Sequence, residues 1–155
     1  MELAIKTGRP AFAEPVYVGA PTVEKEVSAE FYKKMGGIFE RNHFTNNGPL
    51  VRELEAAVAQ MHGVNHCVAV CNATIGQLLV LKALELEGEI IMPSFTFIAT
   101  AHSCLWNNIR PVFCDIDPKT LMIDAKKVEE LITEKTCAVF GVHLFGNICE
   151  VEELA

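Results

Sequence analysis

The stretch from His66 to Ala83, HCVAVCNATIGQLLVLKA, decides the fold of this chain. Its apolar first part predicts a buried strand at Cys67–Cys71, and the polar residues Asn72–Thr74 predict a tight turn. The apolar residues that follow predict a helix from Ile75 to about Leu86. A strand that turns sharply into a helix is the basic unit of an α/β sheet.

The turn at Asn72–Thr74 is a candidate anion site. The first amides of a helix lack partners within the helix, and the helix dipole is positive at that end. Ala73 is small enough for an anion to approach, and Thr74 can add a hydroxyl donor. An ordinary turn in which Asn72 and Thr74 only cap the helix has the same sequence. These residues therefore predict either a phosphate-bearing ligand or a simple helix cap.

Composition excludes several classes of function. A chain of 155 residues is expected to form one ordinary domain, and its 50% apolar content suits a sheet that is buried on both faces. Its net charge of −7 argues against a nucleic-acid surface. No apolar stretch approaches the roughly 18 residues of a membrane span, and the first residues show no secretory signal. We expect neither nucleic acid nor membrane as a partner.

The cysteines and histidines indicate neither disulfides nor a metal. No two cysteines form a CxxC pair, and most lie in or beside apolar segments that read as strands, so we expect reduced thiols in a cytoplasmic protein. The histidines lack metal-ligand spacing, so no metal is assigned. The cysteines are Cys67, Cys71, Cys104, Cys114, Cys137 and Cys149.

The first 65 residues are expected to hold an N-terminal arm at 1–21 and two helices. Apolar residues at every fourth position predict a helix at Val23–Met35 with one buried stripe. A polar, Asn-rich loop follows at Arg41–Pro49. Pro49 suits the first position of a second helix, and Gly63 suits its end.

Strands and helices alternate in the rest of the chain. This order predicts right-handed βαβ units and therefore a mostly parallel sheet with flanking helices. We assign 22–155 to one domain that these residues leave incomplete. The expected strands are Glu89–Met92, Pro111–Ile116 and Cys137–Val142, and the expected helices are Phe97–Trp106, Ala125–Leu131 with Asp124 as its cap, and Glu150–Ala155.

Three segments leave the predicted strands at their carboxyl ends, where ligands bind in open α/β sheets. They are Cys71–Thr74, Pro93–Phe97 and His143–Asn147. Phe97 can stack on a planar ring or serve as a core aromatic residue. His143 can hydrogen-bond a ligand or the backbone of a neighbouring loop. The three segments can form one pocket with a phosphate site, an aromatic platform and a polar lid.

Several motifs in one order resemble the DegT/DnrJ/EryC1/StrS family of pyridoxal-phosphate-dependent sugar aminotransferases. They extend from about Gly8 to Ala155, and they read FTNNGPLVRELE, VNHCVAVCNATIGQLLVLKAL, EIIMPSFTFIATA, RPVFCDIDPKTLMID and VHLFGN. The resemblance implies part of the large domain of an aspartate-aminotransferase-like fold, which is fold type I of the enzymes that use pyridoxal 5'-phosphate (PLP).

The resemblance also assigns roles to residues. Ala73 and Thr74, with Asn72 before them, match the element that binds the cofactor phosphate. Phe97 matches the aromatic residue that lies against the pyridine ring. Asn46, Asn47 and Gly48 match a loop near the sugar-nucleotide substrate. The implied activity is transfer of an amino group to a nucleotide-linked keto-sugar, with glutamate as the amino donor, in a homodimer.

Two catalytic groups of the family find no match in this sequence. The Schiff-base lysine and the acid that pairs with the pyridine nitrogen come after the VHLFGN element, so we expect both beyond Ala155. None of the nine lysines has the required context, and we expect these 155 residues alone to be inactive in transamination. The alternatives are a non-catalytic truncated fragment of the family and a relative with dehydratase or regulatory function.

Overall fold

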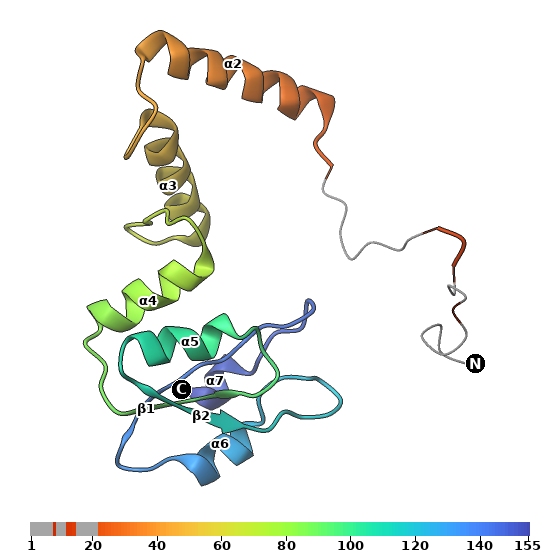
Figure 1. Ribbon diagram of the computed structural model, residues 1–155, viewed down its shortest axis with the longest axis vertical. Coiled ribbons are helices and arrows are strands. Elements are labelled where there is room, and N and C mark those ends of the chain that lie inside the picture. Colours follow the sequence, from red (N-terminus) through yellow and green to blue (C-terminus); the bar gives the residue numbers. More distant parts are fainter. Residues whose placement is uncertain (1–7, 9–11, 15–21) are drawn as a thin grey trace. The chain divides into compact units, whose positions relative to one another are not determined.

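The computed structural model describes residues 8, 12–14 and 22–155 (Figure 1). The chain divides into two compact units, 1–67 and 68–155, and each is described by itself. The expected arm at 1–21 lies mostly outside the described residues, and the assignment of 22–155 to one domain stays a prediction. No helix in the described part of the chain is long and apolar enough to cross a membrane.

The first unit holds helix α2 (Lys25–Arg41) and helix α3 (Pro49–His62). Pro49 begins α3, and Gly63 ends it with φ at 64°, as predicted. The predicted end of the first helix near Met35 is wrong, because α2 continues through Gly36–Gly37. Glycine weakens a helix without preventing it. The expected buried stripe of α2 is also wrong, since the helix has no buried residue.

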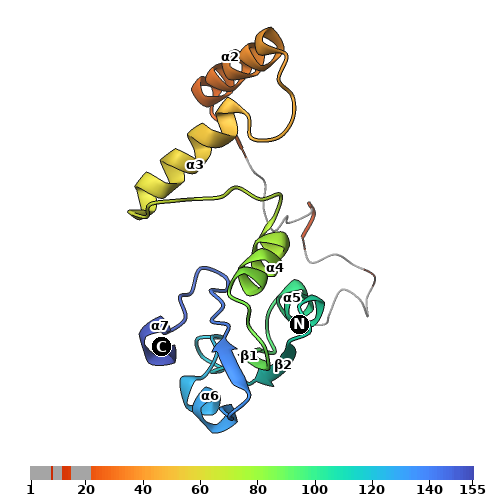
Figure 2. The same ribbon diagram turned by 90° about the vertical axis from the view of Figure 1, so that its left-hand side faces the viewer.

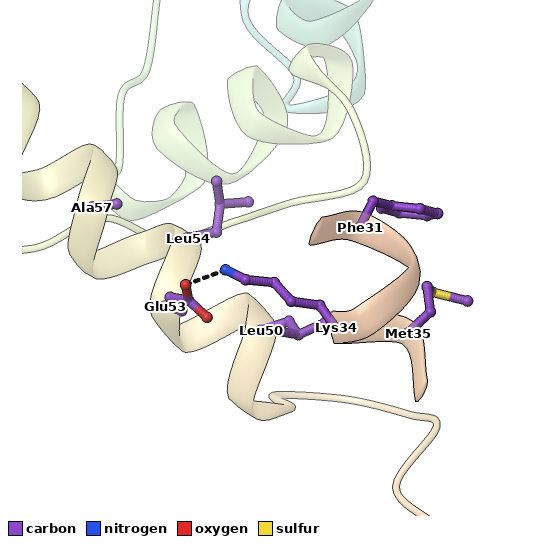
Figure 3. Close-up of a pocket in the computed structure, with 7 residues that line it drawn as sticks. All are labelled: Phe31, Lys34, Met35, Leu50, Glu53, Leu54 and Ala57. Atoms are coloured by element: carbon purple, nitrogen blue, oxygen red, sulfur yellow. Dashed lines mark hydrogen bonds and ion pairs between the residues drawn. The ribbon is translucent and has the colours of Figure 1, made fainter. Parts of the chain in front are cut away.

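A groove of about 300 Å³ lies between α2 and α3 (Figure 3). The Lys34 ammonium of α2 donates a hydrogen bond to the Glu53 carboxylate of α3, and this contact raises the pKa of Lys34. The rest of the groove is apolar, so it offers no unpaired charged group for chemistry. Its other lining residues are Phe31, Met35, Leu50, Leu54 and Ala57.

The second unit is built on a three-stranded parallel sheet, as the alternation of elements predicts. Strand β1 (Glu89–Pro93) lies in the centre, between β2 (Arg110–Cys114) and β3 (Thr136–Val139). Every residue of β1 is buried. Glu89 pairs with Arg110 on one side and with Thr136 on the other. The central strand β1 thus pairs in parallel with both of the other strands.

Alternate side chains of β1 build two cores, one on each face of the sheet. Ile90 and Met92 lie in a cluster with residues of α4 (Ala73–Ala83) and α5 (Ala99–Trp106). Ile91 lies in a second cluster with Val128 of α6 (Ala125–Leu131), and α7 (Val151–Leu154) packs on that face. Figures 1 and 2 show α5 and α6 on opposite sides of the strands. This two-layered covering explains why β1 is apolar at nearly every position.

The predicted strand at Cys67–Cys71 is wrong. This segment does not join the sheet, whose order is β2-β1-β3, and the side chains of Val68 and Val70 are 76% and 40% exposed. A strand exists only when a neighbour accepts its hydrogen-bond ladder. Residues 67–71 have the composition of a strand, and they pair with none of the three strands that the structure describes.

Helix caps follow the sequence more closely than strand pairing does. The Asn72 side chain accepts a hydrogen bond from the Ile75 N–H (2.9 Å), and Asp124 accepts one from the Lys126 N–H (3.0 Å). Both are the short-range contacts that cap residues make. Both bounds of α6 coincide with the predicted ones, and the remaining bounds in the second unit differ by at most three residues.

The Asp117 carboxylate holds the turn after β2. Its hydrogen bonds predict a contribution to the free energy of unfolding that depends on pH. The backbone N–H groups of Thr120 and Lys119 donate to its carboxylate and lower its pKa below 3.8. A lowered pKa in the folded state adds stability above the unfolded pKa, and this stability is lost as the pH falls through the folded value. We expect wild type to lose more stability than Asp117→Ala as the pH falls below about 4. Urea unfolding at several pH values measures it, and parallel curves for the two proteins would contradict it.

Candidate functional site

The N-terminus of α4 presents two backbone donors to solvent. The Ile75 N–H is taken by the Asn72 side chain, and the Gly76 N–H by the Asn72 carbonyl (3.1 Å). Within the described residues, the N–H groups of Ala73 and Thr74 have no hydrogen-bond partner. The cap and the anion site are therefore compatible, because Asn72 fixes the helix start and leaves the first two amides open.

Helix direction places these amides at the carboxyl edge of the sheet. The C-terminal ends of α4 and α5 line one cavity of about 570 Å³. Its lining includes Lys82 of α4, Glu85 just after α4, and Asn107 at the end of α5. Asn107 also donates to the Leu78 carbonyl of α4 (3.3 Å). Helix α5 follows the carboxyl end of β1 and leads into the amino end of β2. The cavity at its C-terminal end therefore lies at the amino ends of the strands. The N-termini of both helices thus face the carboxyl ends.

The segment after β1 brings an exposed aromatic ring to the same edge. Ser94 donates its N–H to the Cys114 carbonyl of β2 (3.1 Å), and the Phe97 carbonyl accepts the Thr100 N–H at the start of α5 (3.0 Å). The Phe97 side chain is 74% exposed, so it is not a core aromatic residue. The ring is available to lie against a planar ligand.

The segments after β1 and β3 meet through two aromatic rings. The Phe95 and Phe145 ring centroids are 6.2 Å apart, with an angle of 57° between the planes. His143 Nδ1 accepts the Cys149 N–H (3.1 Å), and Asn147 donates its side-chain amide to the Thr120 carbonyl (3.0 Å). Of the two contacts predicted for His143, a ligand or a loop backbone, the structure shows the hydrogen bond to the loop backbone. Two of the three predicted segments are in contact, and the third lies at the same end of the unit.

The Asn46–Gly48 loop belongs to the first unit. Asn46 and Asn47 have φ of 42° and 51°, which asparagine tolerates better than most residues. Asn46 and Gly48 line a cavity of about 140 Å³ together with Arg41 and His43, and His43 Nε2 donates to the Thr45 carbonyl (2.8 Å). Sequence reasoning gave Arg41 and His43 no role, although both lie in the polar loop that it singled out.

One ion pair lies near the carboxyl edge. The Lys127 ammonium lies 3.1 Å from the Asp115 carboxylate, next to β2. Burial raises the pKa of the Cys114 thiol at the end of that strand, which keeps it protonated and unreactive. Lys82 lines the cavity at the opposite end of the sheet. The edge provides amides, a hydroxyl group and aromatic rings, which can bind and orient a ligand, and the free thiol of Cys71 is exposed beside the turn before α4.

Comparisons with known proteins agree with this description. A transaminase of Escherichia coli, dTDP-4-amino-4,6-dideoxy-D-glucose transaminase, is 42% identical over 126 residues, which are 81% of this chain and 34% of the relative. GDP-perosamine synthase of Caulobacter vibrioides is 40% identical over 69% of this chain and 29% of its own length. The chain thus spans about a third of the length of the curated relatives that it matches.

Solved structures show the same similarity. DesI, determined in the presence of its TDP-sugar product, aligns with a TM-score of 0.83 and 44% identity over 98% of this chain and 38% of its own. NtdA of Bacillus subtilis, with bound cofactor PMP, aligns with a TM-score of 0.79 and 27% identity over 85% of this chain and 31% of its own. These similarities confirm the expected aspartate-aminotransferase-like fold. The model of the DegT/DnrJ/EryC1/StrS aminotransferase family matches residues 25–155, and the chain belongs to this family.

Proposed function

We propose that this chain forms the cofactor-holding part of a PLP-dependent aminotransferase that acts on a nucleotide-linked keto-sugar. The observation that carries the proposal is the pair of open amides at Ala73 and Thr74, at the sheet edge that also exposes Phe97. Family membership adds the chemistry, since relatives with bound PMP or PLP share the fold.

The residues present fit the two ends of PLP. A phosphate needs donors and room, and the start of α4 offers two amides, the Thr74 hydroxyl and the small side chain of Ala73. A flat pyridine ring needs an apolar surface, which the exposed Phe97 provides. When bound, PLP supplies the electron sink for amino transfer.

The roles of the chain's own residues follow from these positions. Asn72 holds the first turn of α4 by accepting the Ile75 N–H, and this fixes the direction of the two amides. Ala73 and Thr74 donate to the phosphate and anchor the cofactor. Phe97 would offer the apolar face on which the ring rests. These groups bind and orient, so the proton transfers need other residues.

We place the Schiff-base lysine and the acid for the pyridine nitrogen outside these 155 residues. None of the nine lysines belongs to the three segments at the carboxyl edge, and the relatives extend well past the length matched here. Within the first unit, Asn46, Asn47 and Gly48 are proposed to contact the sugar nucleotide. Asn46 and Gly48 line a mainly apolar cavity to which Arg41 and His43 add polar side chains.

The test uses the complete product of the gene. We expect it to bind PLP, to give a visible absorbance band, and to carry the cofactor on a lysine after borohydride reduction, which mass spectrometry locates. A lysine beyond Ala155 supports the proposal. A complete product that ends near Ala155 and binds no PLP would favour the non-catalytic fragment instead.

Glutamate is the proposed amino donor, and competing donors make the choice testable. Streptomyces fradiae has a relative named for glutamine, L-glutamine:2-deoxy-scyllo-inosose aminotransferase. Single turnover of the PLP form with glutamate, glutamine and alanine, each followed by loss of the visible band, ranks them. A band that responds only to glutamine would contradict the glutamate proposal.

We further propose a cytoplasmic homodimer. All six cysteines are free thiols, as a reducing compartment requires. Several large apolar side chains are exposed, among them those of Val68 and Phe97, and apolar surface of this kind favours association. Light scattering of the complete product should give twice the chain mass, and a stable monomer would contradict the dimer.

A further inference from the structure

A tight turn at the carboxyl edge has a residue that does not suit it. Asn147 donates its N–H to the Leu144 carbonyl (2.9 Å), and the two central residues, Phe145 and Gly146, have φ of 51° and 85°. Positive φ at both central positions defines a type I′ turn, which favours Asn-Gly or Gly-Gly. Gly146 fits this preference, whereas Phe145 does not, since bulky residues avoid the left-handed region.

Most other positions with positive φ in the described residues hold asparagine or glycine. Asn42, Asn46, Asn47 and Asn108 all have positive φ. Phe145 is the only aromatic residue with positive φ in the part of the chain that the structure describes. Glu85 and Leu121 also have positive φ, but neither brings an aromatic ring to the carboxyl edge of the sheet. A bulky ring held in an unfavourable turn at the proposed ligand edge indicates a residue kept for function.

Burial does not explain why the ring is there. The Phe145 side chain is 79% exposed, so it adds little to a core. Its one described ring contact is with Phe95, at 6.2 Å between centroids. Phe95 is two residues before Phe97 in the segment that links β1 to α5.

The turn itself is held from both sides. His143 Nδ1 accepts the Cys149 N–H, which closes the loop behind Phe145. The Asn147 side chain reaches the Thr120 carbonyl in the segment after β2. A fixed turn with an outward aromatic ring can hold a neighbouring segment, here 94–97, by ring contact.

We propose that Phe145 is a positioning residue: its ring, presented by the strained Leu144–Asn147 turn, packs on Phe95 and fixes the segment that carries Phe97 for the cofactor ring. This inference rests on the proposed function. It adds a residue from after β3 to a platform that the sequence assigned to Phe97 alone.

The experiment uses variants that separate the conformational preference of the turn from the contact of the Phe145 ring with Phe95. In the complete gene product, Phe145→Asn suits the type I′ turn and removes the ring, and Phe145→Tyr keeps the ring. We expect Phe145→Asn to keep or raise the Tm and to weaken PLP binding about fivefold or more, with Phe145→Tyr close to wild type. Glu85→Asn, at a residue with φ of 50° next to the opposite end of the sheet, is the matched control. It should leave the Kd for PLP unchanged.

A second measurement keeps this inference separate from the proposed function. Hydrogen exchange of the peptide 93–100, measured by mass spectrometry without cofactor, should speed up in Phe145→Asn and stay at the wild-type rate in Phe145→Tyr and Glu85→Asn. Faster exchange in Phe145→Asn supports the positioning role, whether or not the wild type binds PLP. If the wild type binds no PLP, only the proposed function is overturned. Unchanged exchange in Phe145→Asn would overturn the inference. If the wild type binds PLP, an unchanged Kd for PLP in Phe145→Asn would also overturn it.

Discussion

Replacing Gly88 by alanine unfolds the second unit or destabilises it by about 3 kcal/mol or more. Gly88 has φ of 112°, which L side chains rarely adopt, and a Cβ atom there would lie 2.3 Å from the Lys135 carbonyl oxygen. That oxygen accepts the Glu89 N–H (2.9 Å), and the Gly88 carbonyl accepts the Arg110 N–H (2.9 Å). The added methyl group therefore separates β1 from β3 at its first residue and disturbs the contact with β2.

A matched control lies in the same unit. Gly76 is inside α4, and a Cβ atom there would lie 3.5 Å from the Val70 side chain, an ordinary contact. Gly76→Ala should stabilise by about 0.5–1 kcal/mol, because alanine suits a helix better than glycine. Urea unfolding followed by the fluorescence of Trp106, the single tryptophan of the chain, reports on this unit. Equal midpoints for the two variants would show that β1 tolerates a side chain at its entry.

Replacing Ala73 by aspartate separates the two readings of the turn before α4. If the turn only caps the helix, Ala73→Asp is neutral or stabilising by about 0.3–1 kcal/mol, because an acidic residue suits the positive end of a helix. If the turn holds a phosphate, the new carboxylate repels it. At about 4 Å and an effective dielectric constant of 20, the repulsion is about 4 kcal/mol per pair of unit charges. We expect PLP affinity to fall by about a hundredfold or more.

The controls for Ala73→Asp make either outcome decisive. Ala73→Ser keeps a small side chain and no charge, so its Kd for PLP should stay within about threefold of wild type. Thermal unfolding of both variants shows whether the fold is intact. A folded Ala73→Asp variant with wild-type affinity, measured by equilibrium dialysis in the complete gene product, would remove the phosphate from this turn.

Short-range chemistry accounts for the features that the sequence predicts well. Asn72, Asp124 and Gly63 act on backbone groups within a few residues, so their roles do not depend on the rest of the fold. The parallel sheet also follows from the order of its elements. The prediction of a ligand site at the carboxyl edge rests on this topology, which is why the sequence could assign Phe97 and Thr74 to the same edge.

The features that the sequence misses depend on distant partners. Residues 67–71 have the composition of a strand, but strand pairing also needs a neighbouring strand, which cannot be identified from their own sequence. The role of His143 is set by the Cys149 amide. The positive φ of Phe145 contradicts its residue type, so no propensity could predict it. The site residues assigned by resemblance therefore need the binding experiments above.

The central place of β1 has a consequence for the order in which the protein is made. Its two neighbours, β2 and β3, both come later in the chain, so the most apolar strand leaves the ribosome before either of them. At the usual rate of synthesis it waits on the order of a few seconds for Val139 to follow. During that time Ile90, Ile91 and Met92 have no sheet to bury them. The nascent chain is therefore a substrate for chaperones at this segment, and slow codons between residues 93 and 139 would raise its tendency to aggregate.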